Sequence, residues 1–500
     1  MNKISTSLTA VFVLGSSGEI YAQQAPEKPN LILIMTDQQR FDCVGAMGNK
    51  NISTPNIDQL AKDGFMFRNA YTSTPSSTPA RAGLLTGSSP WKHGMLGYSK
   101  VAKKYPNEMP QMLKNAGYYT FGIGKMHYTP QRNLHGFDGT LLDESGRVES
   151  PDFVSDYRQW FAMQAPGEDP DATGIKWNEH TGKVYVNDEK LHPTQWTGNE
   201  AIRFIRNYHQ ANPLFLKISF ARPHSPYDPP QRYYDMYKNT DIPSPFVGDW
   251  CERFADRPMT RDAAFGDFGI EHAIDSRKHY YATVTFVDDQ IGRIISTLKE
   301  NGTYDNSWII FISDHGDMLG DHYHWRKTYA YEGSSHIPFI VKPPKNMETV
   351  LQRGESLEQA VEIRDVLPTF LEIAKIPQPE NMDGMSVVKL LKDKEASWRP
   401  YIDMEHATCY ENANYWAALT DGKMKYIWFF HTGEEQLFDL SKDPGELKNL
   451  VPDKNYSKIT GYWRKEMITH LAERGEPYVK DGKLQIVEKT ILLGRNYPEY

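Results

Sequence analysis

Residues 31–38 read Leu-Ile-Leu-Ile-Met-Thr-Asp-Gln, an apolar run that ends abruptly in the polar pair Asp37 and Gln38. Three further runs repeat this pattern along the chain. Each is short, rich in β-branched or aromatic residues, and typical of a buried strand. The four predicted strands are 31–35, 118–121, 214–220 and 308–312.

Helical patterns lie between these strands, at 57–64, 109–116, 198–207 and 276–301. Strands that alternate with helices indicate a mostly parallel sheet with helices on both faces. We therefore predict an α/β fold built on one large sheet.

The C-terminal part has a different pattern. Residues 415–420 and 424–430 predict a hairpin around Asp421-Gly422, and 437–440 predict a further strand. These elements indicate a smaller α+β subdomain with an antiparallel sheet. We place the boundary within residues 376–400, where Pro377 and Pro379 interrupt the preceding pattern.

The first residues are typical of an export signal. Lys3 precedes a short apolar run at 8–14, and Ala22 is a suitable end point for cleavage. The run is too short to cross a bilayer, and no cysteine follows Ala22 to carry a lipid. We expect an exported, periplasmic protein without a membrane anchor. The predicted divisions are a signal at 1–22, a catalytic α/β domain at 23–385 and the C-terminal subdomain at 386–500.

Composition excludes two classes of function. The net charge is −8, so the chain as a whole does not present a basic face to nucleic acid. A mean hydropathy of −0.62 excludes a polytopic membrane protein. The three cysteines, Cys43, Cys251 and Cys409, allow at most one internal disulfide, and their pairing stays open.

Polar residues that can bind a metal or transfer a proton follow all four predicted strands. Ligands of open α/β sheets bind outside the carboxyl ends of the strands, so these residues predict one shared site. They are Asp37 and Gln38, Lys125 and His127, Arg222 and His224, and Asp314 and His315.

Residues 77–87 form the motif Ser-Thr-Pro-Ala-Arg-Ala-Gly-Leu-Leu-Thr-Gly. Pro79 suits the first turn of a helix, which places Ser77 at the N-terminus, where the helix dipole favours an anion. Arg81 lies one turn further on roughly the same face. Taken alone, a Ser-x-Pro sequence is more often an ordinary helix cap.

With its neighbours, this motif resembles the signature of the formylglycine-dependent sulfatases, in their serine-type bacterial branch. These enzymes belong to the alkaline-phosphatase-like superfamily and include glycosaminoglycan and mucin sulfatases of gut bacteria. Ala80 and Ser88 are minor departures from the signature. The resemblance extends to residues 124–127 (Gly-Lys-Met-His), 314–322 (from Asp-His-Gly-Asp) and 443–450 (from Asp-Pro-Gly-Glu).

The resemblance implies that Ser77 is a precursor. A serine-type radical maturation enzyme would convert it to formylglycine before export. The hydrated aldehyde would attack sulfur with one hydroxyl, and deprotonation of the second would expel sulfate. Plain serine lacks that second hydroxyl.

The resemblance also implies one calcium ion, held by Asp37, Asp314 and the oxygen of residue 77. Gln38 and His315 would complete the cage, since calcium accepts several ligands in irregular geometry. Gln38 replaces a commoner Asp, and His315 replaces a commoner Asn. The imidazole nitrogen of His315 is a poor ligand for so hard a cation.

The remaining catalytic roles are implied in the same way. Arg81, Lys125 and Lys327 would meet the charge on sulfate. His224 would protonate the leaving oxygen with help from Lys327, and His127 would accept the proton whose loss releases sulfate.

Substrate recognition is weakly encoded in the sequence. Candidate contacts are Arg222, His324, Arg326, Trp91 and Glu405. The leading substrates are sulfated glycosaminoglycan or mucin sugars, with a mild preference for galactose or N-acetylgalactosamine units. Two alternatives stay open: a phosphomonoesterase or phosphodiesterase of the same superfamily, and a non-catalytic glycan-binding protein if Ser77 is unmodified.

Overall fold

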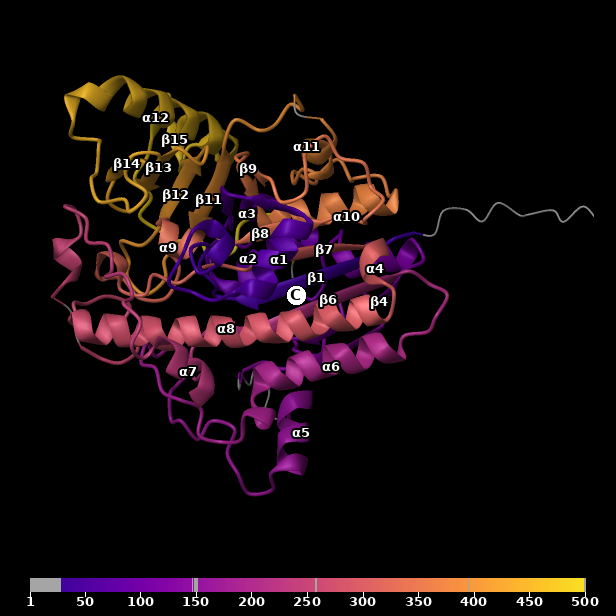
Figure 1. Cartoon of the computed structure of the whole chain (residues 1–500). Coiled ribbons are helices and arrows are strands. Elements are labelled where there is room, and N and C mark those ends of the chain that lie inside the picture. The colour runs from indigo at the N-terminus through magenta and orange to yellow at the C-terminus, as the bar shows by residue number, and fades with distance from the viewer. Residues whose placement is uncertain (1–27, 146, 148–151, 257–258, 394, 499–500) are drawn as a thin grey trace, which may run out of the picture.

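The computed structural model describes residues 28–498 except 146, 148–151, 257–258 and 394. The predicted export signal at 1–22 lies outside the described residues. Figure 1 shows a large layered α/β body with a second, smaller sheet and its covering helix at one corner.

An eight-stranded sheet forms the centre of the molecule, in the order β5-β4-β6-β1-β7-β8-β2-β9. The four predicted strands are neighbours in it, and all four run parallel. They are β1 (Asn30–Asp37), β4 (Tyr119–Gly124), β6 (Leu214–Pro223) and β7 (Ser307–Ser313). Towards the edges lie β5 (Gly139–Leu142), β8 (Phe339–Lys342), β2 (Phe65–Phe67) and β9 (Ser356–Leu357). The predicted α/β fold with a mostly parallel sheet is confirmed.

Helices cover both faces of this sheet because alternate side chains of each strand point to opposite faces. Ile32 and Ile34 of β1 join one buried cluster, whereas Leu31 and Leu33 join another. The first face packs on α1 (Pro55–Asp63), α6 (Pro193–Asn207) and α8 (Ile270–Glu300). The second packs on α2 (Ser77–Thr86), α4 (Met109–Asn115) and α10 (Val366–Ala374).

The predicted antiparallel sheet is present in the C-terminal part. It consists of β11 (Ile402–His406), β12 (Trp416–Thr420), β13 (Met424–Phe429) and β14 (Glu435–Asp439), with α12 (Ser457–Leu471) packed against it. The domain boundary after residue 385 stays a prediction. Shorter elements are β3 (Ala70–Tyr71), α3 (Pro90–His93), α5 (Asp156–Gln164), α7 (Gln231–Tyr237), α9 (Glu332–Ser335), β10 (Val361–Glu362), α11 (Val388–Lys392), β15 (Val479–Lys480) and β16 (Lys483–Leu484).

The three cysteine side chains are free thiols. Within the described part of the chain, no helix combines the length and the apolar character needed to cross a membrane.

Candidate active site

Ser77 begins helix α2, as the Ser-x-Pro motif predicts. Its side chain is buried, and its Oγ lies 3.0 Å from His315 Nε2 and 3.3 Å from Asp37 Oδ2. The preceding Ser76 is held from the C-terminal sheet, where His406 Nε2 lies 2.8 Å from its Oγ. The nucleophile candidate therefore sits at a helix N-terminus, supported by both parts of the molecule.

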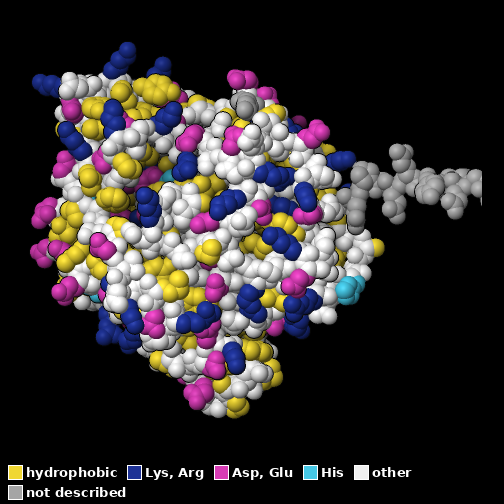
Figure 2. Space-filling view, in the orientation of Figure 1, with side chains coloured by type: hydrophobic (Ala, Val, Ile, Leu, Met, Phe, Trp, Pro, Cys, Tyr) yellow, Lys and Arg dark blue, Asp and Glu magenta, His cyan; other side chains and the backbone are white. Residues whose placement is uncertain are grey.

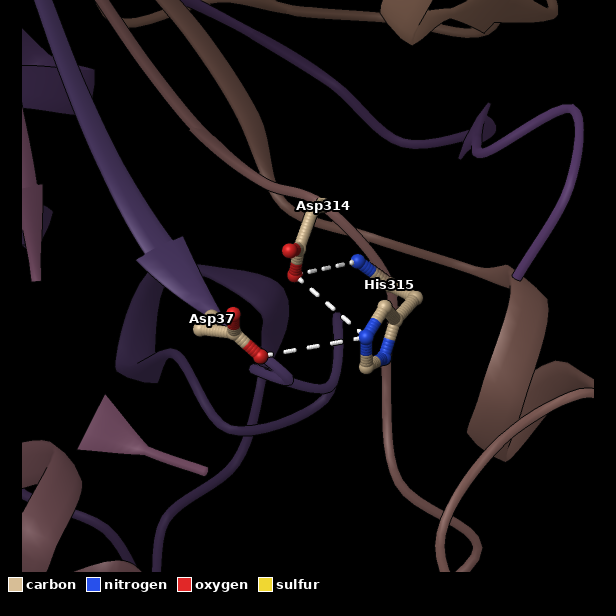
Figure 3. Close-up of side chains that lie close together, drawn as sticks. All are labelled: Asp37, Asp314 and His315. Atoms are coloured by element: carbon tan, nitrogen blue, oxygen red, sulfur yellow. Dashed lines mark hydrogen bonds and ion pairs between the residues drawn. The ribbon is translucent and has the colours of Figure 1, made fainter. Parts of the chain in front are cut away.

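Asp37, Asp314 and His315 come together at the carboxyl ends of β1 and β7 (Figure 3). One ligand atom from each lies within 4.8 Å of the others, and all three residues are buried. His315 Nδ1 lies 2.9 Å from the carbonyl of Gly316 and donates to it, so Nε2 carries a lone pair. Burial, assisted by the charge of Lys327, lowers the pKa of His315 and keeps the ring neutral.

This donor set fits a divalent cation. Asp37 Oδ1 and His315 Nε2 both face Ser77 Oγ, at 3.4 and 3.0 Å. Two carboxylates and an oxygen suit calcium, while the neutral imidazole also suits manganese or zinc. The side chain of Gln38 is engaged elsewhere: its Oε1 accepts from Lys327 at 2.7 Å and its Nε2 donates to Asp317 at 2.5 Å.

Arg81 links the two acidic residues. Its Nε donates to Asp314 Oδ2 at 3.0 Å and its Nη2 donates to Asp37 Oδ2 at 3.1 Å, with all three side chains fully buried. Its Nη1 donates to the carbonyl of Lys125 at 2.5 Å. This fork geometry suits a planar guanidinium and would not be reproduced by lysine. Arg81 thereby fixes the orientation of both carboxylates.

Lys125 lies on the other side of Asp37, with its Nζ 2.6 Å from Oδ2. Burial alone would raise the pKa of Asp37, but Lys125 and other nearby cations hold it well below its usual range. The same burial lowers the pKa of Lys125. The indole of Trp177 covers the ammonium at 4.5 Å from its ring centre. Trp177 also packs on His224, with 4.5 Å between ring centres.

His224 and Lys327 form a hydrogen-bonded pair. His224 Nδ1 lies 2.8 Å from the carbonyl of Ser225 and donates to it, so Nε2 accepts from Lys327 Nζ at 2.7 Å. Burial and the charge of Lys327 lower the pKa of His224. Burial also lowers the pKa of Lys327 to about 8. The transferable proton of the pair therefore resides on Lys327.

His127 is a buried imidazole, and neither ring nitrogen has a hydrogen-bond partner among the described residues. Burial, with Arg147 and Lys125 nearby, lowers its pKa well below the usual range, so the ring is neutral. Its φ of 61° lies in the left-handed region. Glu144 Oε1 stabilises this backbone by accepting from the amide of His127 at 3.0 Å. A neutral, unpaired imidazole is suited to accept a proton.

Four predicted substrate contacts are engaged by protein partners. Arg222 pairs with Asp228 at 2.7 Å, and Glu405 pairs with Arg474 at 2.7 Å. Trp91 packs against Tyr478 and carries the guanidinium of Arg474 over its ring at 4.7 Å. His324 lies in an aromatic cluster with Phe254, Phe265 and Tyr329. Their contact with substrate stays a prediction. The guanidinium of the fifth candidate, Arg326, lies over the ring of Tyr410, 4.1 Å from its centre.

Sequence reasoning missed Glu144 and Trp177. Glu144 closely follows the short strand β5, which lacks the long apolar run of the predicted strands. Trp177 belongs to an irregular segment between α5 and α6, where no periodic pattern marks it. The only available signal was its residue type, an aromatic side chain in a polar loop.

The positive charge is local to the site. On the face in Figure 2, Lys and Arg side chains are interspersed with Asp and Glu. Inside the site, the buried cations Arg81, Lys125 and Lys327 meet the two carboxylates Asp37 and Asp314. An anion that reaches these residues therefore meets three fixed cations.

Comparisons with known proteins agree with this geometry. The family model described as "Sulfatase" matches residues 29–376, and that of "N-sulphoglucosamine sulphohydrolase, C-terminal" matches 320–473. An arylsulfatase of Clostridium perfringens is 39% identical over 91% of this chain and 97% of its own length. An N-acetylglucosamine-6-O-sulfatase of Bacteroides thetaiotaomicron is 25% identical over 94% of this chain and 90% of its own. The crystal structure of a phosphonate monoester hydrolase of Agrobacterium radiobacter superposes with a TM-score of 0.76 at 26% identity, covering 89% of this chain and 96% of that one.

Proposed function

The chain belongs to the sulfatase family and is a sulfuric ester hydrolase, and we propose that it removes sulfate from O-sulfated saccharides of glycosaminoglycans or mucins. The observation that carries the proposal is the convergence of Ser77, its acidic neighbours and three buried cations at one edge of the sheet. A mild preference for galactose or N-acetylgalactosamine units is part of the proposal. The similarity to the N-acetylglucosamine-6-O-sulfatase of Bacteroides thetaiotaomicron supports a saccharide substrate.

Residue 77 supplies the nucleophile in this proposal. Formylglycine, formed from Ser77 by a serine-type radical maturation enzyme before export to the periplasm, would supply an aldehyde hydrate with one hydroxyl for attack and one for release. The burial of Ser77 at the start of α2 keeps bulk water from competing. His127, a buried neutral imidazole, would accept the proton whose loss releases sulfate.

A single calcium ion would polarise the sulfate oxygens and favour the ionised hydrate. Asp37, Asp314, His315 and the oxygen of residue 77 would hold it. Gln38 would join them only by giving up its contact with Lys327, and in the present arrangement it orients that ammonium. Calcium is favoured by the two carboxylates, whose charges suit a hard cation.

The chain's own cations bind the sulfuryl group and protonate the leaving oxygen. Arg81 and Lys125 are fixed by the Asp37 carboxylate, so they need no reorganisation as charge builds up in the transition state. The pair of Lys327 and His224 protonates the departing sugar oxygen: the Lys327 ammonium supplies the proton, and His224 Nε2 orients that ammonium by accepting from it. Trp177 covers Lys125 and His224 and excludes water from both.

Sulfate release from a panel of defined sulfated saccharides tests the function. The protein is produced with and without a serine-type maturation enzyme, and intact mass reports the loss of two hydrogens at residue 77. We expect turnover only in the modified sample, and metal analysis should find one calcium per chain. Modified, metal-loaded protein that releases no sulfate from any saccharide would refute the proposal. Unmodified Ser77 in the native host, with saccharide binding retained, would instead indicate a glycan-binding protein.

The structural likeness to a phosphonate monoester hydrolase supports a second candidate, hydrolysis of phosphate or phosphonate esters. A two-metal phosphatase would need carboxylates where Lys125 and His127 lie. Within the described residues, Asp37, Asp314 and His315 form a single metal-ligand group. Two transition-metal ions per chain, together with a higher kcat/KM for a phosphonate monoester than for any sulfate ester, would favour this candidate.

A further inference from the structure

Arg326 is a buried arginine for which the described part of the chain supplies no partner of opposite charge. The residue is only 6% exposed, and its Nε has no hydrogen-bond partner within that part. Among the described residues, no carboxylate forms an ion pair with its guanidinium. Every other buried arginine of the described chain does have such a pair: Arg40, Arg81, Arg222, Arg277, Arg364 and Arg474.

The acid that contacts Arg326, Asp317, binds its backbone and forms no ion pair with its guanidinium. Asp317 Oδ1 accepts from the backbone amide of Arg326 at 3.0 Å. Its Oδ2 accepts from Gln38 Nε2 and from the hydroxyl of Tyr227, both at 2.5 Å. The carboxylate therefore fixes the backbone of Arg326, and leaves the side-chain charge without compensation. An uncompensated buried charge is costly unless a ligand pairs with it.

The charge of Arg326 acts on the ammonium of Lys327, so the two side chains lie close together. Arg326 precedes Lys327, whose Nζ lies 2.7 Å from His224 Nε2. The ring of Tyr410, from the segment between β11 and β12, lies 4.1 Å from the guanidinium carbon. Tyr410 is 41% exposed, so this contact lies at the surface end of the side chain.

A second aromatic residue, Tyr98, lies near both Tyr410 and His127. Tyr98 is 46% exposed, and its ring centre is 6.2 Å from that of His127. Arg326 and Tyr98 both lie close enough to the Tyr410 hydroxyl to act on it electrostatically. Tyr98 thus neighbours His127, and Tyr410 neighbours both Tyr98 and Arg326.

We propose that Arg326, covered by Tyr410, is a second anion-binding subsite, and that the preferred substrate carries a carboxylate or a further sulfate beside the sulfate ester that is cleaved. This inference rests on the proposed function and narrows its substrate class to saccharides with at least two anionic groups. A guanidinium binds either oxyanion through two parallel hydrogen bonds, and the neighbouring tyrosine ring limits its motion.

The test compares matched substrates on the matured, metal-loaded enzyme. One saccharide carries a single sulfate and a neutral neighbouring sugar. The second has a uronic acid neighbour, and the third has a second sulfate. In Arg326→Gln, we expect the ratio of kcat/KM for a dianionic to the singly sulfated substrate to fall about 10- to 100-fold, mainly through KM. Comparison of the uronate and the disulfated saccharide shows which oxyanion is preferred.

Two further variants separate charge from packing. Arg326→Lys should restore part of the ratio, because it returns the charge but not the two-bond geometry. Arg253→Gln removes an arginine whose partner Glu434 lies at 2.8 Å in a half-exposed pair, and it should leave the ratio at the wild-type value. A ratio unchanged in Arg326→Gln, or lowered equally in Arg253→Gln, would overturn the proposal.

Binding measurements keep this inference separate from the proposed function. Calorimetry on Ser77→Ala protein needs no turnover. We expect the dianionic saccharides to bind more tightly than the singly sulfated one, and Arg326→Gln in this background to remove the difference. Equal affinities would overturn the second subsite even if the enzyme hydrolyses sulfate esters. If no sulfate ester is hydrolysed, the proposed function fails, and the binding difference still decides the subsite.

Discussion

Replacing Arg81 by methionine should destabilise the metal-free protein and make it more dependent on metal. The guanidinium donates to Asp314 at 3.0 Å and to Asp37 at 3.1 Å, and none of the three side chains is exposed. Its removal leaves Asp37 paired with Lys125 at 2.6 Å, while Asp314 loses its arginine partner. Breaking a buried pair of this kind costs about 3–5 kcal/mol, and we expect a loss of unfolding free energy in that range.

A bound cation changes this loss because it competes with Arg81 for the same two carboxylates. A ligand at 100 times its Kd stabilises a protein by about 2.7 kcal/mol. If removal of the competing charge raises metal affinity tenfold, the same metal concentration adds about 1.4 kcal/mol more in the variant. Sulfate hydrolysis should still fall about 100- to 1000-fold, since the sulfuryl group loses a fixed cation.

The assay is urea and thermal unfolding of both proteins in EDTA and in excess calcium, followed by tryptophan fluorescence. Arg474→Met is the matched control: this arginine is equally buried and pairs with Glu405 at 2.7 and 2.8 Å in the C-terminal part. It should lose a similar free energy in both conditions. A loss below about 1 kcal/mol for Arg81→Met in EDTA, or equal stabilisation by calcium in variant and wild type, would refute the reasoning.

Three more predictions concern the proton source Lys327 and two residues that support the site, Glu144 and Trp177. Because burial lowers the pKa of Lys327 to about 8, hydrolysis of saccharide sulfates should decline as the pH rises through 8 and the ammonium is lost. A pH–rate profile of Lys327→Arg should show this decline at higher pH, and an unmoved profile would exclude Lys327 as the proton source. Glu144→Gln should lower kcat about tenfold with little change in KM, because a charged acceptor of the His127 amide becomes neutral; unchanged steady-state kcat would contradict this role. Trp177→Ala should admit water to Lys125 and His224 and lower kcat/KM about tenfold, whereas Trp177→Phe should retain most of it; equal losses in both variants would show that the ring face is not what matters.

Much of the site was predictable because a buried parallel strand has a simple signature. Strands covered on both faces read as continuous apolar runs, and the first polar residue after each run lies at the carboxyl edge. Asp37 and Asp314 follow neighbouring strands, and the structure brings them together in the way that this rule requires. The helix start at Ser77 followed from Pro79 alone, since proline is tolerated there.

The parts that sequence could not predict depend on which side chains pair across long separations. Glu405 stands next to His406, but alternate residues of β11 point to opposite faces. His406 therefore contacts Ser76, while Glu405 pairs with Arg474. Likewise, nothing in the sequence near Gln38 indicates that its amide holds Lys327, a residue 289 positions away. Such pairings are decided by tertiary packing and leave no local pattern.

The neutrality of Gln38 and His315 follows from the charge balance of the site. Three buried cations lie among the carboxylates Asp37, Asp314 and Asp317, and burial lowers the pKa of both Lys125 and Lys327 although Asp37 raises it. Fixed positive charge of this kind destabilises the resting protein, but it is already oriented when charge develops on the sulfuryl oxygens. A carboxylate in place of Gln38 would lie against Lys327, raise its pKa and hold the proton that must be transferred. A neutral amide at this position orients the ammonium without neutralising it.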